Sequence, residues 1–484
     1  MAFIDGTVVN VALPAIQANF HATVVDVQWV VESYGLFLGA LILVGGSLGD
    51  LFGRRLIFVV GIAIFTVASA VCGCSLNIYQ LIAARSVQGI GAALLVPGSL
   101  AIISASFDEK SRGRAIGSWS GFTAITTAIG PVLGGWLVEH GSWRWVFFIN
   151  LPLAAAVIAI SLRHIPESRI ASAGRVDWWG APLATVGLGG LVAGFMESVN
   201  LGWRNPLVFG SLIVGVGCLI AMVIVEHSVA APMLPLAVFE SRSFTGANLL
   251  TLFLYAAIGI FFFLFPLNLI QVQGYSATVA GAAVLPLILF IFFLSRWSGS
   301  LVARYGPEIP LIAGPLIVSL GFALFALPSV GESYWTTFFP AIVVLGFGMA
   351  VTVAPLTTVV MNSVSKDRVG AASGINNAVA RVAGVLAIAV FGIAMLKVFG
   401  SQMNHSLAHL SVPAAAMRQL HAEEIKLAGL QIPPGLSPKT VTAIGESVKE
   451  SFVFGFRIVM LACAGLSLAS AAVAWLTIRK DTEG

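Results

Sequence analysis

Long stretches without a charged side chain alternate with short polar connections along the whole chain. An ionised side chain in hydrocarbon costs at least about 2.5 to 3.5 kcal/mol, so each sufficiently long charge-free stretch predicts a membrane-spanning helix. Spans at residues 2–19, 78–104 and 371–399 complete a predicted total of fourteen, because the 53-residue stretch 243–295 is divided in two by its polar segment Gln271–Ser276. The charge-free stretches are 33–49, 56–84, 115–138, 145–162, 178–196, 205–225, 243–295, 309–331, 333–365 and 458–478.

The positive charges predict how these helices are oriented. Short loops rich in Lys and Arg stay on the cytoplasmic side of a membrane. One set of alternate connections carries fourteen such residues, whereas the opposite short loops carry only Arg144 and Arg204. We therefore expect both termini in the cytoplasm and the long connection Ser401–Ser451 outside. The fourteen residues are Arg54, Arg55, Lys110, Arg112, Arg114, Arg163, Arg169, Arg175, Arg242, Arg304, Lys366, Arg368, Arg479 and Lys480.

An internal repeat divides the chain. Three pairs of similar features recur at offsets of 253, 258 and 257 residues, which predicts two six-helix halves, 1–165 and 243–484, with two inserted helices and their linkers in 166–242. Two membrane halves of like orientation are typical of transporters that work by alternating access. The pairs are Gly46–Gly53 with Gly299–Gly306, Pro97 with Pro355, and Gly113 and Gly117 with Gly370 and Gly374.

Composition excludes several classes of protein. The 484 residues are 58% hydrophobic and only 10% charged, against about 25% in a soluble domain, so the bilayer is the first expected partner. The net charge of +4 comes from scattered Lys and Arg residues, which predicts no nucleic-acid partner. The chain has no HExxH, GxSxG or GxxxxGK[ST] motif, so we expect neither an enzyme nor an ATP-driven pump.

The cysteines and histidines predict no metal centre. Cys72, Cys74, Cys218 and Cys463 fall inside predicted spans, where they indicate neither a disulfide framework nor a zinc site. Helical spacing in the outer connection 401–451 predicts an amphipathic helix after Pro413. Its pattern includes Arg418, His421, Glu424 and Ile425, and the earlier pair His405 and His409 lacks further ligands nearby.

Four sequence motifs stand out, which are Gly46–Arg55, Leu81–Gly91, Gly121 with Gly130–Gly135, and Asp5–Pro14. They resemble motifs of the major facilitator superfamily and, within it, of the fourteen-span drug:proton antiporters. The resemblance covers the whole chain and implies proton-driven export of amphipathic small molecules or drugs across the bacterial inner membrane, without a cofactor. The alternatives are a metabolite or siderophore exporter and a proton symporter of the same fold. We expect a functional monomer, and a periplasmic adaptor as partner if the cell has two membranes. Further residues are also similar to that group, namely Trp143–Trp145, Asn150, Pro152 and Gln271–Ser276.

The first motif predicts a gating loop. Its glycines, Gly46 and Gly53, allow a tight turn and close helix approach, and Arg54 and Arg55 can pair with carboxylates across the domain interface. The resemblance implies that Asp50 latches one conformation with support from Arg54. Departures from the family pattern, Leu51 in place of a basic residue and Ala303 in the second copy, restrict a strong latch to the first half.

The glycines of the fifth span predict a close helix interface. Pro131 bends the helix, and small residues around it let another helix approach at backbone distance, so we expect a tight seal, with a purely structural kink as the alternative. These residues are Gly121, Gly130, Pro131, Gly134 and Gly135.

Ionisable residues inside predicted spans are candidates for transport chemistry. Asp5 lies about 18 Å and Arg85 about 12 Å below the outer surface at 1.5 Å per residue, so the two are expected to meet in a central cavity. Burial favours a protonated Asp5, whereas Arg85 or a cationic substrate favours the carboxylate, so proton and substrate would compete there. Glu32 is expected at the outer mouth near Tyr34, either as a solvated rim charge or as an alternative proton site.

Arg381 belongs to a polar stripe with Ser373 and Asn377, which must face protein or a watery cavity. Its guanidinium can pair with a carboxylate or bind an anionic substrate. The expected polar residues of the cavity are Asn10, Tyr34, Tyr255, Asn377 and Arg381, with Asn248 and Asn268 as further candidates.

The first span is short. Measured back from residue 17 to Met1 it reaches about 24 Å, less than the roughly 30 Å of a hydrocarbon core. We therefore expect the natural start to lie upstream, with about eight or more apolar residues missing.

Overall fold

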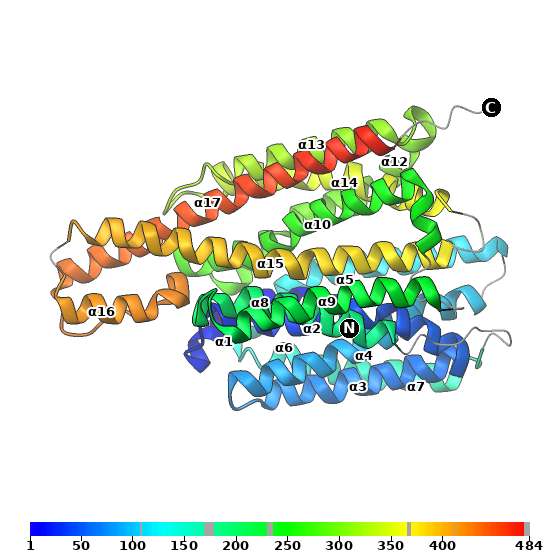
Figure 1. The fold of residues 1–484 in the computed structure, drawn as a ribbon, viewed down its shortest axis with the longest axis horizontal. Helices are drawn as coiled ribbons and strands as arrows, with labels where there is room; N and C mark the ends of the chain where they lie inside the picture. Colours follow the sequence, from blue (N-terminus) through cyan, green and yellow to red (C-terminus); the bar gives the residue numbers. More distant parts are fainter. Residues whose placement is uncertain (107–108, 169–178, 230–235, 365–368, 411, 479–484) are drawn as a thin grey trace.

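The computed structural model describes residues 1–106, 109–168, 179–229, 236–364, 369–410 and 412–478, and within these residues the regular structure is helical (Figure 1). The first half contains α1 (Ala2–Phe20), α2 (Val24–Phe52), α3 (Arg54–Cys74), α4 (Ile78–Ser106), α5 (Glu109–His140), α6 (Trp145–Phe148) and α7 (Asn150–His164). Two further helices, α8 (Gly180–Leu201) and α9 (Pro206–Ser228), follow it.

The second half begins after the short 3-10 segment η1 (Leu236–Glu240). It contains α10 (Arg242–Leu267), η2 (Asn268–Val272), α11 (Ala277–Ala282), α12 (Leu285–Tyr305), α13 (Glu308–Leu324), η3 (Tyr334–Phe338), α14 (Phe339–Asn362), α15 (Val369–Leu407), α16 (Ala414–Glu423), η5 (Glu424–Gly429) and α17 (Pro438–Thr477).

The helices follow the predicted spans. Eleven helical segments of the described chain are long and apolar enough to cross a membrane, by length and composition. Each of the fourteen predicted spans coincides with one helix or with two consecutive ones. The all-helical membrane architecture is therefore confirmed, and the count of fourteen crossings stays a prediction.

The inserted pair lies beside both halves. α8 packs against α9, and it also contacts α2 of the first half and α15 of the second half (Figure 1). Because α9 packs chiefly on α8, it keeps large apolar side chains such as Leu207 and Phe209 exposed. This is the surface expected of a helix that faces lipid.

The two ends of the helix bundle differ in charge. We call one the basic end, where α2, α7 and α12 finish and Arg54, Arg55, Arg163, Arg242 and Arg304 lie. We call the other the far end, where α1 and α5 finish and α2 and α11 begin. Sharp turns connect the helices there: His21 adopts φ 50° after α1, and Thr23 and Asp26 form a capping box at the start of α2.

The last two long helices project beyond the far end of the bundle (Figure 1). α15 has 39 residues and α17 has 40, or roughly 60 Å each, about twice the thickness of a hydrocarbon core. Most of the predicted connection Ser401–Ser451 is thus helical rather than a loop. It also holds α16 in the region where an amphipathic helix was expected, followed by η5, which contacts α1 and α2.

Candidate functional site

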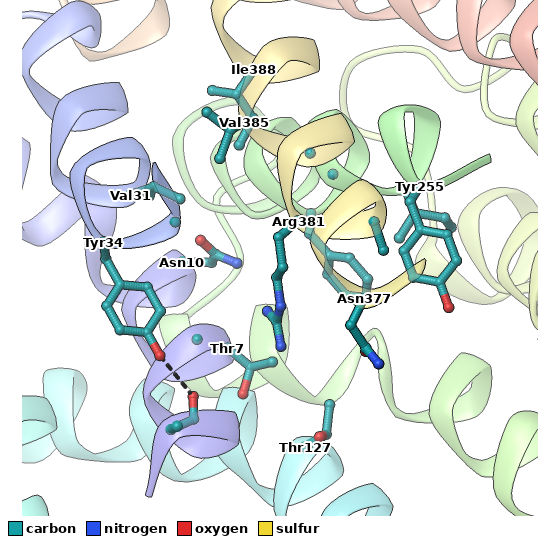
Figure 2. Close-up of a pocket in the computed structure, with 18 of the residues that line it drawn as sticks. Thr7, Asn10, Val31, Tyr34, Thr127, Tyr255, Asn377, Arg381, Val385 and Ile388 are labelled. Carbon is teal, nitrogen blue, oxygen red and sulfur yellow. Dashed lines mark hydrogen bonds between the residues drawn. The ribbon is translucent and has the colours of Figure 1, made fainter. Parts of the chain in front are cut away.

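A cavity of about 460 Å³ lies between the two halves (Figure 2). Helices α1, α2, α4 and α5 contribute its walls from the first half, and α10, α14 and α15 from the second. It extends toward the basic end, because Thr357 and Met361 near the end of α14 and Ser373 near the start of α15 line it. The volume falls within the range typical of sites for drug-sized ligands.

Asp5 is the centre of a buried polar network in the first half. Arg85 Nη1 donates to Asp5 Oδ2 in an ion pair between two almost fully buried side chains. Gln88 Nε2 donates to Asp5 Oδ1 at 2.9 Å, and Asn150 Nδ2 donates to the same oxygen at 3.2 Å. The network joins α1, α4 and the start of α7, and it offsets much of the cost of burying both charges.

The structure brings Asp5 and Arg85 together, but it places them differently relative to the cavity. Arg85 lines the cavity, with its guanidinium carbon 4.2 Å from the centre of the Tyr34 ring, whereas Asp5 is not among the lining residues. Arg85 thus lies in the central cavity as expected, whereas Asp5 lies behind its wall, and competition between proton and substrate at Asp5 stays a prediction.

Sequence reasoning overlooked two partners of Asp5. Gln88 follows Arg85 by three residues, and side chains at i and i+3 share a helix face. The spacing therefore predicts that Gln88 lies beside Arg85. Asn150 comes from α7, far away in the chain. Its membership of the network depends on how α7 packs against α3, which the sequence pattern does not specify.

Glu32 does not lie at a solvated outer mouth. Its exposed fraction is 0%, it lines the cavity from α2, and neither carboxyl oxygen has a hydrogen-bond partner within the described part of the chain. Depth along α2 alone predicts a position at the outer mouth, but the packing of α2 against α15 encloses this face of the helix. An ionised carboxylate without a partner is costly to bury.

The polar stripe of α15 faces the cavity. Ser373, Asn377 and Arg381 all line it, as do Asn10 and Tyr255 from other helices. Figure 2 shows the Arg381 side chain extending between Asn10 and Tyr34 on one side and Tyr255 and Asn377 on the other. The Tyr34 hydroxyl donates to the carbonyl of Ala2 at 3.4 Å.

Two further asparagines lie elsewhere. Asn376 Nδ2 donates to Asn248 Oδ1 at 3.2 Å, and this bond holds Asn248 inside the packing of α10 against α15. Asn268 is 1% exposed and accepts from Gln273 at 3.3 Å. Neither lines the cavity, so the expectation that they contribute to its polar wall is wrong for this conformation.

The glycines of α5 fit the close interface that they predict. A β-carbon at Gly134 would overlap Val8 of α1, and one at Gly130 would overlap Thr7. A β-carbon at Gly135 would overlap the carbonyl oxygen of Ala277 in α11. The far part of α5 thus touches α1 on one face and the second half on another. Gly121 lies outside the residues whose side-chain surroundings are described.

The far end of the cavity is closed by contacts between the halves. α2 packs against α15, where Gln28 Nε2 donates to the carbonyl of Ile388 at 3.4 Å. Gln271 of η2 donates to Gln17 of α1 at 2.8 Å, and Gln17 donates to the carbonyl of Lys426 in η5 at 3.2 Å. These contacts, with the α5–α11 interface, place the described inter-half seals at the far end.

Glu139 and Thr278 form an exposed link across the same seam. Thr278 Oγ1 donates to the Glu139 carboxylate at 2.5 Å, joining α5 to α11 just beyond the predicted fifth span. This hydrogen bond is the largest of the effects that lower the pKa of Glu139 below its usual value. Because the lowered pKa reflects a contact with the ionised form, the link is present at neutral pH and is lost as pH falls through that pKa.

Removing this link should loosen the far-end seal slightly. We expect Glu139→Ala to shift the equilibrium toward an opened far end by less than about tenfold, because exposed polar pairs contribute little. The measurement is the distance distribution between spin labels at the exposed residues Leu76 and Leu327, one in each half. Thr278→Val should give the same shift, and the double variant no more; additive effects would show that the two residues act separately.

The predicted gating segment is held by residues of the first half and of the linker after it. Gly53 adopts φ 118° between α2 and α3, a conformation suited to glycine. Glu167 accepts the backbone N–H of Arg55 at 3.0 Å and pairs with its guanidinium at 3.7 Å. Arg54 donates to the carbonyl of Ala101 in α4 at 3.3 Å.

These partners correct one expectation about the gating segment. The described carboxylate partner of Arg55 belongs to the linker after α7, rather than to the second half. Gly46 packs near Pro97 of α4 within the first half. The side chain of Asp50 lies outside the described residues, so its gating role stays a prediction.

The chain is similar throughout its length to transporters. The family model for the Major Facilitator Superfamily matches residues 1–187 and 178–388. "Multidrug resistance protein Stp" of Mycobacterium tuberculosis is 32% identical over 498 residues, covering 100% of this chain and 90% of the relative. "Tetracenomycin C resistance and export protein" of Streptomyces glaucescens and "Puromycin resistance protein pur8" of Streptomyces alboniger are each 31% identical, with the same coverage.

Solved structures support the fold. A bacterial homologue of the human lysosomal transporter Spinster, crystallised in an inward-facing and unoccupied conformation, matches with a TM-score of 0.66 and 18% identity. The match covers 99% of this chain and 96% of the other. An auto-inhibited peptide transporter of the POT family matches with a TM-score of 0.62 and 14% identity, over 100% and 97% of the two chains.

Proposed function

We propose that this chain, which belongs to the Major Facilitator Superfamily and is of its multidrug-efflux type, exports amphipathic small molecules in exchange for protons. The names of its relatives refer to resistance to or export of structurally different antibiotics, which supports a broad substrate range. The observation that carries the proton-coupled part of the proposal is the buried Asp5–Arg85 pair behind the wall of the inter-half cavity.

The positive charges at the basic end support placing that end in the cytoplasm. On this basis both termini are cytoplasmic and the membrane is the bacterial inner membrane. The cavity then extends toward the cytoplasm while the far-end seals are closed. This arrangement is the one in which a cytoplasmic substrate would enter.

The Asp5 network suggests how a proton could be exchanged for substrate. In this conformation the Asp5 carboxyl accepts hydrogen bonds from Arg85, Gln88 and Asn150. A proton bound at Asp5 from the far side would break its ion pair and free Arg85 at the cavity wall. The charge that the cavity presents to substrate would then differ between the inward-facing and the outward-facing conformation. Exchange requires such a difference, because substrate must bind the two conformations with different affinities.

Alternating access follows from the distribution of the seals. The halves would rock so that the far-end contacts of α2 with α15 and of α5 with α11 separate while the basic end closes. The gating segment Gly46–Arg55 lies at the end that must close, so it is placed to stabilise the outward-facing state.

The experiment that tests this function measures proton movement directly. Purified protein is reconstituted into vesicles holding a pH-sensitive dye, and tetracenomycin C or puromycin is added outside without an imposed pH gradient. Where a transporter molecule carries the drug into the vesicle, antiport moves protons out and makes the lumen more alkaline. Symport moves protons in with the drug and makes the lumen more acidic. Acidification of the lumen, substrate entry without any pH change, or no entry of any tested drug would contradict the proposal.

A further inference from the structure

Arg381 carries an uncompensated charge in the cavity. Within the described residues, its guanidinium has no hydrogen-bond or ion-pair partner. Its side chain nevertheless points into the space between the halves (Figure 2). An arginine about twelve residues, or roughly 18 Å, along α15 is costly in a membrane unless water or an anion surrounds it.

The packing around Arg381 is close at its Cβ atom, whereas its guanidinium extends into the cavity. A β-carbon at Gly39 would lie 3.3 Å from Cβ of Arg381, so the glycine lets α15 approach α2 closely at this level. The guanidinium extends beside Thr7, Asn10 and Asn377, which offer hydroxyl and amide groups. These neighbours can hydrogen-bond a polar ligand but cannot neutralise a cation.

The other charged residues of the cavity do not balance Arg381. Asp5 is already bonded to Arg85, Gln88 and Asn150 and is not among the residues that line the cavity. Glu32 lines the cavity, and its carboxyl has no hydrogen-bond partner among the described residues. Glu32 lies two turns of α2 nearer the far end than Gly39, which packs against Arg381. Between them, Gly35 packs against Val385, which lies one turn nearer the far end of α15 than Arg381. The Glu32 carboxyl therefore lies on the far-end side of the guanidinium.

The rest of the cavity wall suits an apolar ligand. Ile258, Phe262, Val360 and Met361 line it on the side of the second half, opposite Thr7 and Asn10. A ligand that fills this space would place its apolar body against α10 and α14 and one polar group beside α15. The described cationic residues of the wall are Arg85, which is paired with Asp5, and Arg381, which has no partner among the described residues. The charge of Arg381 therefore decides the chemistry of that polar group.

We propose that Arg381 binds the carboxylate of an amphipathic substrate, so that the exporter takes aromatic or aliphatic acids into this cavity. A guanidinium recognises a carboxylate through two parallel N–H donors, and the bond is strengthened where water is scarce. The inference rests on the proposed function, since it names the substrate class of the same cavity. It differs from a cation-binding site, which would need an ionised carboxylate in the place that Arg381 occupies.

The test compares three ligands that share one ring system. Binding of tritiated 1-naphthylacetate, 1-naphthylacetamide and 2-(1-naphthyl)ethylammonium is measured on the purified full-length protein in detergent. We expect the carboxylate to bind at least about tenfold more tightly than the amide, and the ammonium most weakly. Arg381→Gln should abolish this preference, and Arg381→Lys should keep part of it because the charge remains.

The control removes a positive charge from the same helix outside the cavity. Lys397 is an exposed residue of α15 whose Nζ lies 5.9 Å from the centre of the Trp203 ring. Lys397→Gln should keep the preference for the carboxylate. Equal binding of carboxylate and amide by the unmodified protein, or an unchanged preference in Arg381→Gln, would overturn the proposal.

Failure of this inference can be told from failure of the proposed function. If tetracenomycin C or puromycin still moves in exchange for protons while the carboxylate preference is absent, the exporter stands and the role of Arg381 falls. If the preference is present and lost in Arg381→Gln but no substrate moves protons, the binding site stands and proton exchange falls.

Discussion

Asp5→Asn should abolish drug export driven by a pH gradient. Asparagine keeps the size of the side chain and can still accept a hydrogen bond, but it cannot bind or release a proton. It also leaves the Arg85 guanidinium without a counter-charge, and removing one partner of a buried pair typically costs about 3–5 kcal/mol. We therefore expect gradient-driven transport in vesicles to fall more than about a hundredfold, to the passive leak.

A second assay separates lost coupling from lost folding or binding. Counterflow, in which unlabelled drug inside the vesicles exchanges for labelled drug outside at equal pH, needs no net proton movement. Asp5→Asn should retain counterflow, and its melting temperature should show that it is folded. Full gradient-driven transport by this variant would contradict the assignment of Asp5.

Glu32→Gln provides the matched comparison at a second buried acid of the first half. Both substitutions replace a buried acid with its amide, but Glu32 has no hydrogen-bond partner to lose among the residues that the structure describes. We expect gradient-driven transport to continue in Glu32→Gln. The reverse pattern, with Asp5→Asn active and Glu32→Gln inactive, would move the proton site to Glu32.

The helices and the Asp5–Arg85 contact could be predicted because they depend on position along single helices. Charge-free stretches identify spans, since the bilayer excludes ions whatever the tertiary packing. Depth along a helix follows from its fixed rise, so two residues at similar depths in one bundle can be expected to meet. The polar stripe through Arg381 faces the cavity for the same reason, because a regular helix sets which residues share a face.

The sequence could not supply the rotation of one helix against another. Depth along the helices predicts Glu32 at the outer mouth and Asp5 in the central cavity, but depth does not say toward which neighbour a side chain turns. The structure turns Glu32 into the cavity and Asp5 toward Gln88 and Asn150. Similarly, the carboxylate partner of Arg55 is Glu167, a surface residue that no membrane pattern distinguishes.

Gly135→Leu should prevent the far-end seal from forming. The glycine lies where α5 of the first half meets α11 of the second, and an added β-carbon would lie 2.6 Å from Cα of Thr278 as well as overlapping the Ala277 carbonyl. Backbone atoms cannot move aside as flexible side chains can, so the two helices must separate. We expect transport to fall to background and the distance between labels at Leu76 and Leu327 to increase.

The control places the same side chain where nothing obstructs it. Gly217 in α9 is exposed on the lipid-facing helix, and a β-carbon added there would meet no heavy atom within 4 Å. Gly217→Leu should therefore retain transport and the label distance, in a background with the four cysteines replaced by serine. If Gly135→Leu also keeps the short label distance and full transport, then the α5–α11 contact is not a seal that the cycle needs. A lost activity with an unchanged distance would instead assign the glycine to helix folding, and the far-end closure would depend on the contacts of α2 with α15 and of Gln17 with η2 and η5.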